Sequence, residues 1–211
     1  MSGLTNNPRR FLTMTKREKL LEMAHKAGIL RPQDAEAAGI SAVYLNKLHA
    51  EGALERPSRG IYVLPGTDFG ENQTLLEACQ RVPSGVICLL TALRFHDLTT
   101  QAPYEVWMAI PEKARRPRVE YPPIRIVRFS TVAMRHGVNK VKTKGGEICV
   151  YSPAKTVADC FKYRNKIGLD VAIEALRDCW SQKKATSDQI WQAAKVCRMT
   201  NVMRPYMEAL V

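Results

Sequence analysis

The sequence has no long apolar segment. Its longest strongly apolar run, residues 86–93, is far shorter than the ~18 residues that a membrane-spanning helix needs. The N-terminal residues also lack the apolar core of a secretory signal, so we expect a cytoplasmic protein with no membrane contact. Hydrophobic residues at 45% and charged residues at 25% are ordinary for a globular chain. This composition excludes a mostly disordered or fibrous protein, and 211 residues suit one or two domains.

The cysteines and histidines show no metal-ligand spacing. None of the six cysteines forms a CxxC pair, and several lie in apolar segments such as 86–90 and 148–150. We therefore expect buried, reduced thiols and neither a zinc site nor a disulfide framework. The four histidines have no carboxylate or cysteine at a suitable spacing. No metal and no cofactor is predicted.

Motifs of the common enzyme classes are missing as well. The chain contains no GxSxG, Walker-type loop, HExxH or GxGxxG. His96, after an apolar segment, is interpreted as the end of a helix. Lys155 and Asp159, four residues apart on one helix face, are interpreted as an exposed ion pair. No catalytic residue is predicted, so we expect no enzyme. The alternative is a nucleic-acid-processing or modifying enzyme whose activity lies in the C-terminal domain.

Acidic residues are too few to balance the basic ones. Lys and Arg number 32 against 20 Asp and Glu, which leaves a net charge of +12 and favours nucleic acid as the partner. Most of the surplus lies in 113–144, a run that we expect to be rich in loops and exposed, because so many charges cannot be buried unpaired. Three roles are open for this run: it contacts DNA phosphates, it docks an acidic protein, or it is a solvated surface. The candidate phosphate or partner contacts are Lys113, Arg115, Arg116, Arg118, Arg125 and Arg128.

Residues 13–65 show the pattern of three short helices followed by a hairpin. Gly39 suits the sharp, left-handed turn between the second and third helices. The third helix is expected over 41–51, and two short strands over 53–56 and 60–64. This order is typical of a winged helix-turn-helix, so 13–65 is predicted to be a DNA-binding domain.

The third helix of such a domain lies in the major groove, and the hairpin forms the wing. With Leu45 and Leu48 assigned to the core, Asn46 suits an adenine edge, Ala42 a thymine methyl group, and Tyr44 a phosphate or a stacking contact. The predicted DNA contacts are Ser41, Ala42, Tyr44, Asn46, Lys47, Arg56 and Arg59. The alternative is a protein-interaction or packing module whose exposed face is only solvated.

Residues 72–211 are expected to form one further domain. The patterns predict helices over 73–81 and 85–96, strands over 104–110, 124–129 and 147–151, and then helices over 153–163, 169–180, 187–197 and 201–210. The predicted fold class is therefore α+β: an N-terminal winged helix-turn-helix followed by a mixed α/β C-terminal domain that ends in a helical bundle.

Several segments together resemble the AbiEi antitoxins of type IV toxin–antitoxin systems. In the first domain these are AEAAGIS at 35–41 and RGIY at 59–62. In the second they include VICLLTAL at 86–93 and YSPAKTVAD at 151–159. One departure is Lys155, where the pattern has Arg; the charge is kept, but an ammonium cannot bond in the bidentate manner of a guanidinium.

The resemblance implies a winged helix that binds double-stranded operator DNA and represses its own operon. It further implies a C-terminal antitoxin domain over 72–211 that counteracts a nucleotidyltransferase-type toxin, in the type IV scheme without a tight complex. Such systems serve in phage defence by abortive infection. The other open alternative is a plain transcriptional regulator without a toxin.

Overall fold

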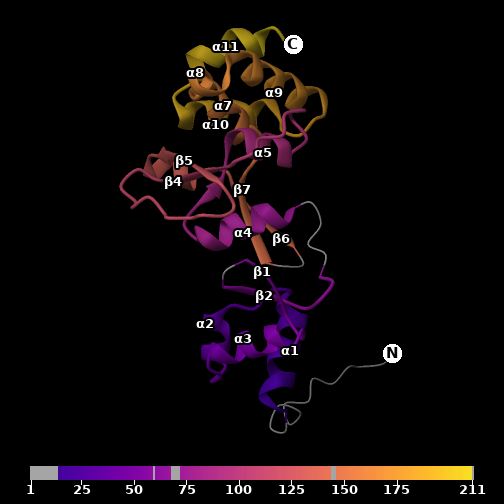
Figure 1. The fold of residues 1–211 in the computed structure, drawn as a ribbon. Coiled ribbons are helices and arrows are strands. Elements are labelled where there is room, and N and C mark those ends of the chain that lie inside the picture. The colour runs from indigo at the N-terminus through magenta and orange to yellow at the C-terminus, as the bar shows by residue number, and fades with distance from the viewer. Residues whose placement is uncertain (1–13, 59, 68–71, 144–145, 211) are drawn as a thin grey trace, which may run out of the picture. The chain divides into compact units, whose positions relative to one another are not determined.

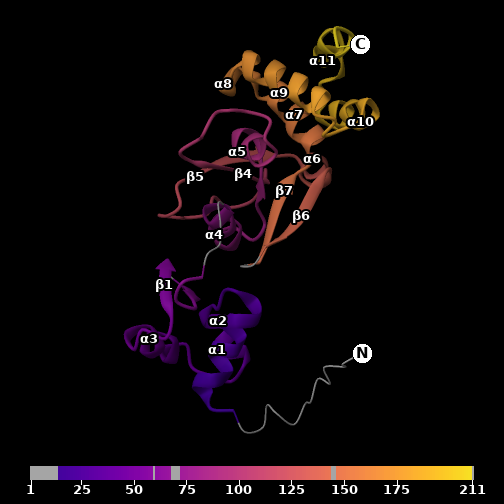
Figure 2. The same cartoon turned by 90° about the vertical axis from the view of Figure 1, so that its right-hand side faces the viewer.

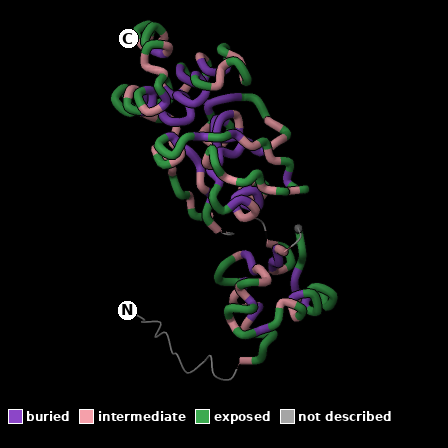
Figure 3. The backbone as a smooth tube through the Cα atoms, turned by 90° about the vertical axis from the view of Figure 1, so that its left-hand side faces the viewer, coloured by how far each residue is buried: buried purple, intermediate pink, exposed green. Residues whose placement is uncertain are grey.

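In the computed structural model, which describes residues 14–58, 60–67, 72–143 and 146–210, the chain divides into two units (Figure 1). Unit 1 comprises residues 1–70 with 143–146, and unit 2 comprises 71–142 with 147–211. Buried residues gather inside each unit separately (Figure 3). Each unit therefore has its own hydrophobic core.

Unit 1 consists of three helices and a two-stranded sheet. Its elements are α1 (Lys16–Ala27), α2 (Pro32–Ala37), α3 (Val43–Ala50), β1 (Glu55–Ser58) and β2 (Ile61–Val63). Thr15 and Glu18 form a capping box at the start of α1, and each side chain bonds the other residue's backbone N–H. The strands pair antiparallel, and the backbone of Leu30 bridges to Tyr62 beside them. This is the predicted order of a winged helix-turn-helix.

The turn between α2 and α3 brings these two helices together. Gly39 has a φ of +77°, in the left-handed region that a side chain disfavours. Ala35, before the turn, is completely buried, and Ile40, after it, joins the core. Leu45 and Leu48 are completely buried on the inner face of α3, as predicted. The outer face of α3 consequently carries the polar residues of the helix together with Val43.

Unit 2 is built on a mixed five-stranded sheet with the strand order β5-β4-β3-β7-β6. The strands are β3 (Val86–Ile87), β4 (Val106–Pro111), β5 (Ile124–Phe129), β6 (Val138–Thr143) and β7 (Gly146–Tyr151). Strand β4 runs parallel to β5 and antiparallel to β3, and β3 runs parallel to β7.

Helices precede, interrupt and follow this sheet (Figure 2). They are α4 (Gln73–Arg81), α5 (Leu89–Phe95), α6 (Thr131–Arg135), α7 (Pro153–Lys162), α8 (Arg164–Ile167), α9 (Leu169–Ser181), α10 (Ser187–Cys197) and α11 (Thr200–Glu208). Helix α7 packs against α5, α9 and α10, so it lies at the centre of the helical layer. The mixed α/β domain with a helical C-terminal part confirms the predicted fold class.

Two local expectations for unit 2 were wrong. A single helix was expected over 85–96, but the structure has β3 followed by α5, because a short apolar run fits a buried central strand as well as a buried helix. The run 113–144 was expected to be rich in loops apart from the predicted strand over 124–129, but it also contains α6 and β6. Strand β6 lies at the edge of the sheet with mostly polar residues, so it lacks the apolar alternation that predicts a strand.

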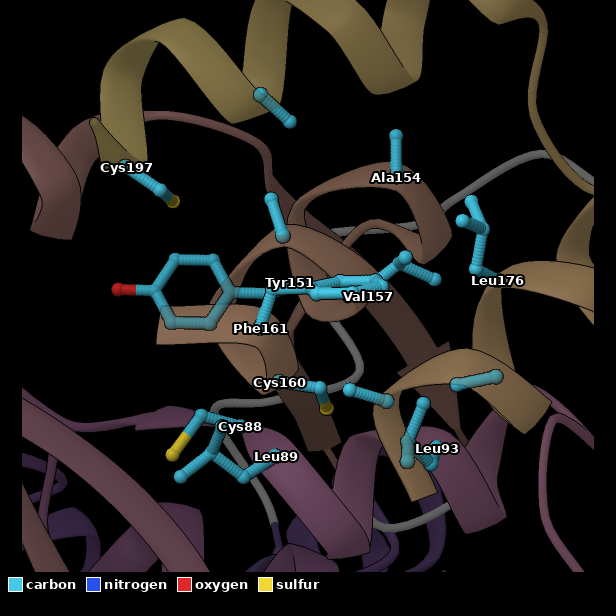
Figure 4. Packing of buried hydrophobic residues seen from close by; sticks show 14 of the residues in the cluster. Cys88, Leu89, Leu93, Tyr151, Ala154, Val157, Cys160, Phe161, Leu176 and Cys197 are labelled. Atoms are coloured by element: carbon cyan, nitrogen blue, oxygen red, sulfur yellow. The ribbon is translucent and has the colours of Figure 1, made fainter. Parts of the chain in front are cut away.

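The core of unit 2 holds most of the cysteines. Cys88, Cys160 and Cys197, from three different parts of the unit, point into it beside Tyr151 (Figure 4). All six cysteines are free, and Cys149 alone among them is only partly buried. Burial raises the pKa of Cys197 to about 12 and that of Cys79 to about 11. Such thiols are uncharged and unreactive near neutral pH.

The Lys155–Asp159 pair is buried, which corrects the expectation of an exposed ion pair. Lys155 Nζ lies 2.5 Å from Asp159 Oδ2 on α7, and both side chains are almost fully removed from solvent. The ammonium lies 4.3 Å from the ring centroid of Tyr151 and 4.7 Å from that of Phe129. Cys197 Sγ donates to Asp159 Oδ1 at 3.2 Å. Burial raises the pKa of Asp159 above its ordinary value, although the neighbouring ammonium opposes this shift.

Candidate nucleic-acid interface

The outer face of α3 is open to solvent. Ser41, Asn46 and Lys47 are exposed, and so is the apolar Val43, at 71%. The hydroxyl of Ser41 accepts a hydrogen bond from the Val43 backbone N–H at 3.4 Å and so helps to start the helix. The start of α3, which is the part of a recognition helix nearest to base edges, thus carries no covering layer within the described part of unit 1.

Two of the predicted contacts are only half-exposed. Ala42 is partly buried, and Tyr44 packs against the core of unit 1, so part of its ring has a structural role. Lys47 Nζ lies 5.7 Å from the centroid of the Tyr44 ring and 3.9 Å from a carboxylate oxygen of Glu51. Both Lys47 interactions are at the surface, where they contribute little to stability. The lysine is therefore available to a phosphate.

Tyr62 of β2 contacts the predicted base-reading residue. Its phenolic O–H donates to Asn46 Oδ1 at 2.6 Å, although Tyr62 itself is only 3% exposed. The carbonyl oxygen of Asn46 keeps a second lone pair, and its NH₂ group keeps both donors. Asn46 thus presents an oriented amide that still offers a donor and an acceptor. Sequence reasoning missed Tyr62, because a buried strand residue shows no sign of a polar contact at its tip.

Tyr62 also contacts the wing. The guanidinium of Arg56 in β1 lies 5.5 Å from the centroid of the Tyr62 ring, a cation–π distance. The Arg56 side chain is exposed. One buried tyrosine therefore holds a polar residue of the third helix and a cation of the hairpin at the same surface. The other predicted wing contact, Arg59, lies outside the described residues.

The predicted basic contacts of unit 2 lie in two places. Lys113, Arg115, Arg116 and Arg118 occupy the connection between β4 and β5, and within the described part of the chain none of them makes an ion pair. Arg125 and Arg128 extend from β5. Arg125 lies 4.4 Å from the Trp107 ring centroid and 3.7 Å from Glu105 Oε2.

Arg128 bonds to the backbone of the connection between β4 and β5. Its Nη1 donates to the backbone oxygens of Glu112 at 2.6 Å and Ala114 at 2.8 Å, so it fixes the beginning of the connection. A cavity of about 280 Å³ beside it is lined by three cations, Arg116, Arg128 and Lys166, together with Tyr163 and two apolar residues. Cations from the connection, from β5 and from α8 thus meet around this cavity.

Among the described residues, no group of three or more His, Cys, Asp or Glu side chains is placed to hold a metal ion. No helix in the described ranges has the length and apolar character to cross a membrane.

By fold and exposed surface, unit 1 is a winged helix-turn-helix domain. Residues 17–65 match the model of a family described as "Transcriptional regulator, AbiEi antitoxin". This segment is therefore of the AbiEi regulator type, and the resemblance drawn from the sequence is confirmed there.

Two further comparisons concern the whole chain. No curated protein matches it. The crystal structure of the RV2827C protein from Mycobacterium tuberculosis is similar, with a TM-score of 0.53 and 11% sequence identity over 93% of this chain and 80% of that chain. At such low identity the similarity concerns the fold alone.

Proposed function

We propose that this protein is a DNA-binding autoregulator and antitoxin of the cytoplasm. In this proposal α3 enters the major groove of operator DNA and the β1–β2 hairpin contacts the neighbouring backbone or minor groove. Binding represses the protein's own operon, and the C-terminal domain counteracts a nucleotidyltransferase-type toxin. The family that residues 17–65 match is described as one of regulators and antitoxins, which supports the proposed regulator over the enzyme alternative.

The observation that carries the proposal is the link through Tyr62. It orients the exposed amide of Asn46 on α3 and lies beneath the guanidinium of Arg56 on the wing. A surface that only contacts water does not require an amide held in one orientation beside a cation. A groove-binding surface uses the amide to read a base and the cation to bind a phosphate.

The test is a salt-titrated binding assay on the promoter upstream of this gene, with random duplex of equal length for comparison. Asn46→Ala is expected to relax specificity at one base pair by ~1–3 kcal/mol, because it removes a base-reading side chain. Arg56→Ala and Arg59→Ala are expected to weaken binding on any duplex and to reduce the salt slope by ~0.9 for each phosphate that is no longer neutralised. Lys195→Ala, an exposed lysine of α10, removes the same charge and serves as the control.

Equal decreases in affinity on operator and random duplex for all three variants would refute the base-reading role of Asn46. Full affinity in all three would refute DNA binding by this face.

The antitoxin part has its own test. Co-expression with the toxin encoded next to this gene is expected to restore growth, and the winged-helix variants are expected to retain this protection. In the type IV scheme the two proteins do not form a tight complex, so co-purification is not expected. Loss of protection in Asn46→Ala, at unchanged protein level, would contradict a separate antitoxin function in residues 72–211. The absence of a nucleotidyltransferase gene nearby would favour a plain regulator.

We further propose that Lys113, Arg115, Arg116, Arg118, Arg125 and Arg128 contact phosphates or a partner. The small number of acids in this part of the chain and the cationic cavity beside it support this role.

A further inference from the structure

Two exposed tyrosines lie beside the basic connection of unit 2. Tyr104 is 84% exposed and Tyr121 is 56% exposed, although tyrosine side chains are normally more buried than this. Tyr104 precedes β4 and Tyr121 precedes β5, and these strands pair in parallel with Val106 opposite Ile124. Both tyrosines therefore lie at the same end of the sheet.

The tyrosines border a large hollow. A cavity of about 870 Å³ is lined by both of them and by residues from α4, α5 and the segments that lead into β4 and β5. Its charged lining residues are Arg94, Asp97 and Glu105. Such a volume holds a planar ring system, and aromatic walls with a few polar groups are typical of small-molecule and base-binding sites.

The long connection from β4 to β5 carries positive charge and leads to Tyr121. Because the two strands are parallel, the connection begins at the end of the sheet opposite to the two tyrosines and returns to their end. The connection contains only two acidic residues, Glu112 and Glu120. Its four cations are Lys113, Arg115, Arg116 and Arg118. Arg116 also lines the cationic cavity of about 280 Å³. Because Arg116 and Tyr121 are five positions apart, the chain between them spans at most about 18 Å. The cations Arg116 and Arg118 and the two tyrosine rings are thus within reach of one strand of several nucleotides.

We propose that this tyrosine–arginine surface, made of Tyr104, Tyr121 and the four cations Lys113, Arg115, Arg116 and Arg118, binds single-stranded nucleic acid. The tyrosine rings stack on unpaired bases, and the cations bind the phosphates of the same strand. Cationic tracks combined with aromatic platforms are the usual means by which proteins bind single strands. The function goes beyond the duplex binding proposed for unit 1 and does not depend on it.

The cavity distinguishes a single strand from the other polyanions. In a duplex, each base is covered on both faces by its neighbours, so no face is free to stack on a tyrosine. An acidic peptide without aromatic groups has no ring to stack on the two exposed tyrosines. Asp97 and Glu105 in the lining can accept hydrogen bonds from the amino groups of a base. An unpaired base therefore fits both the rings and the lining of the hollow.

The test measures binding of the full-length protein to fluorescently labelled 12-nucleotide strands of RNA and of DNA with the same mixed sequence. Tyr104→Ala and Tyr121→Ala are each expected to weaken binding by at least about fivefold, the lower end of what removal of one stacked base costs. Tyr104→Phe keeps the ring and is expected to bind like the wild type. Arg115→Ala/Arg118→Ala is expected to reduce the salt slope by ~0.7 for each phosphate that is no longer neutralised.

Two controls make the result specific. Lys183→Ala/Lys195→Ala removes the same charge from exposed positions outside this surface and is expected to leave strand binding unchanged. Poly-glutamate, an acidic chain without bases, is expected to compete much less than the unlabelled strand. Because the Tyr104 side chain is almost fully exposed, Tyr104→Ala is expected to fold normally, and its thermal unfolding midpoint checks this.

Wild-type affinity in both alanine variants would overturn the proposal, as would displacement by poly-glutamate as effective as displacement by the strand. Stronger binding of either RNA or DNA supports the proposal and identifies the preferred strand. A failure of the duplex proposal would be recognised in a separate experiment, because that proposal is tested with the Asn46 and Arg56 variants on promoter DNA.

Discussion

Substituting Lys155 by methionine would leave the carboxylate of Asp159 buried without its cation. In the native protein the two groups are 2.5 Å apart and almost inaccessible to solvent. Breaking a buried pair by removing one partner costs ~3–5 kcal/mol, whereas an exposed pair contributes only ~0–1 kcal/mol. We therefore expect Lys155→Met and Asp159→Asn each to lower the free energy of unfolding by ~3–5 kcal/mol. The double variant is expected to lose clearly less than the sum, because no uncompensated charge remains.

The two single variants are expected to differ in their response to pH. Burial already raises the pKa of Asp159 in the native protein, and Lys155→Met removes the ammonium that opposes this shift. The native state of Lys155→Met then binds more protons than the unfolded state, so its stability rises as pH falls from 7 to 5, with a limiting slope of ~1.4 kcal/mol per pH unit. Asp159→Asn has no buried carboxylate to protonate at this position, so this rise is expected to be absent.

Urea unfolding followed by tryptophan fluorescence is the suitable assay. All three tryptophans, Trp107, Trp180 and Trp191, belong to unit 2, so the signal reports the unit that contains the pair. Decreases below about 1 kcal/mol in both single variants, as for exposed pairs, would refute the reasoning. An equal rise in stability towards pH 5 in both variants would refute it as well.

Three further predictions follow from single interactions. Tyr62→Phe removes the donor to Asn46, a bond worth ~0.5–1.5 kcal/mol, and is expected to reduce discrimination between promoter and random duplex; unchanged discrimination would contradict its positioning role. Gly137→Ala is expected to cost at least ~1–2 kcal/mol in the fluorescence assay, because φ is +68° and the new Cβ would lie 2.8 Å from Lys155 Cβ; wild-type stability would contradict this. A thiol reagent is expected to modify Cys149 first in the folded protein and the other cysteines only on unfolding; fast reaction of several thiols would show that the core is open.

Local sequence patterns were sufficient for the outline of both units. The glycine at position 39 marks a boundary that depends on neighbouring residues only, and the structure has the turn where it was expected. The strand over 124–129 and the helix over 73–81 were predicted with the observed bounds. The functional roles of the α3 and wing residues remain predictions that the binding assays above decide.

Other features depended on which segments pack together. The spacing of Lys155 and Asp159 shows that they share a helix face. It does not show that α5, α9 and α10 pack on α7 or that two aromatic rings lie beside the ammonium. The pairing of β3 between β4 and β7 likewise depends on partners far along the chain.

By itself, the sequence determined the winged helix, the positive charge and the class of fold, because periodicity, caps and composition act through near neighbours. Only the tertiary structure placed Tyr62 against Asn46, buried the ion pair of α7, and left Tyr104 and Tyr121 exposed beside the basic connection. The physical reason is that burial and side-chain contacts depend on the surfaces that meet in three dimensions.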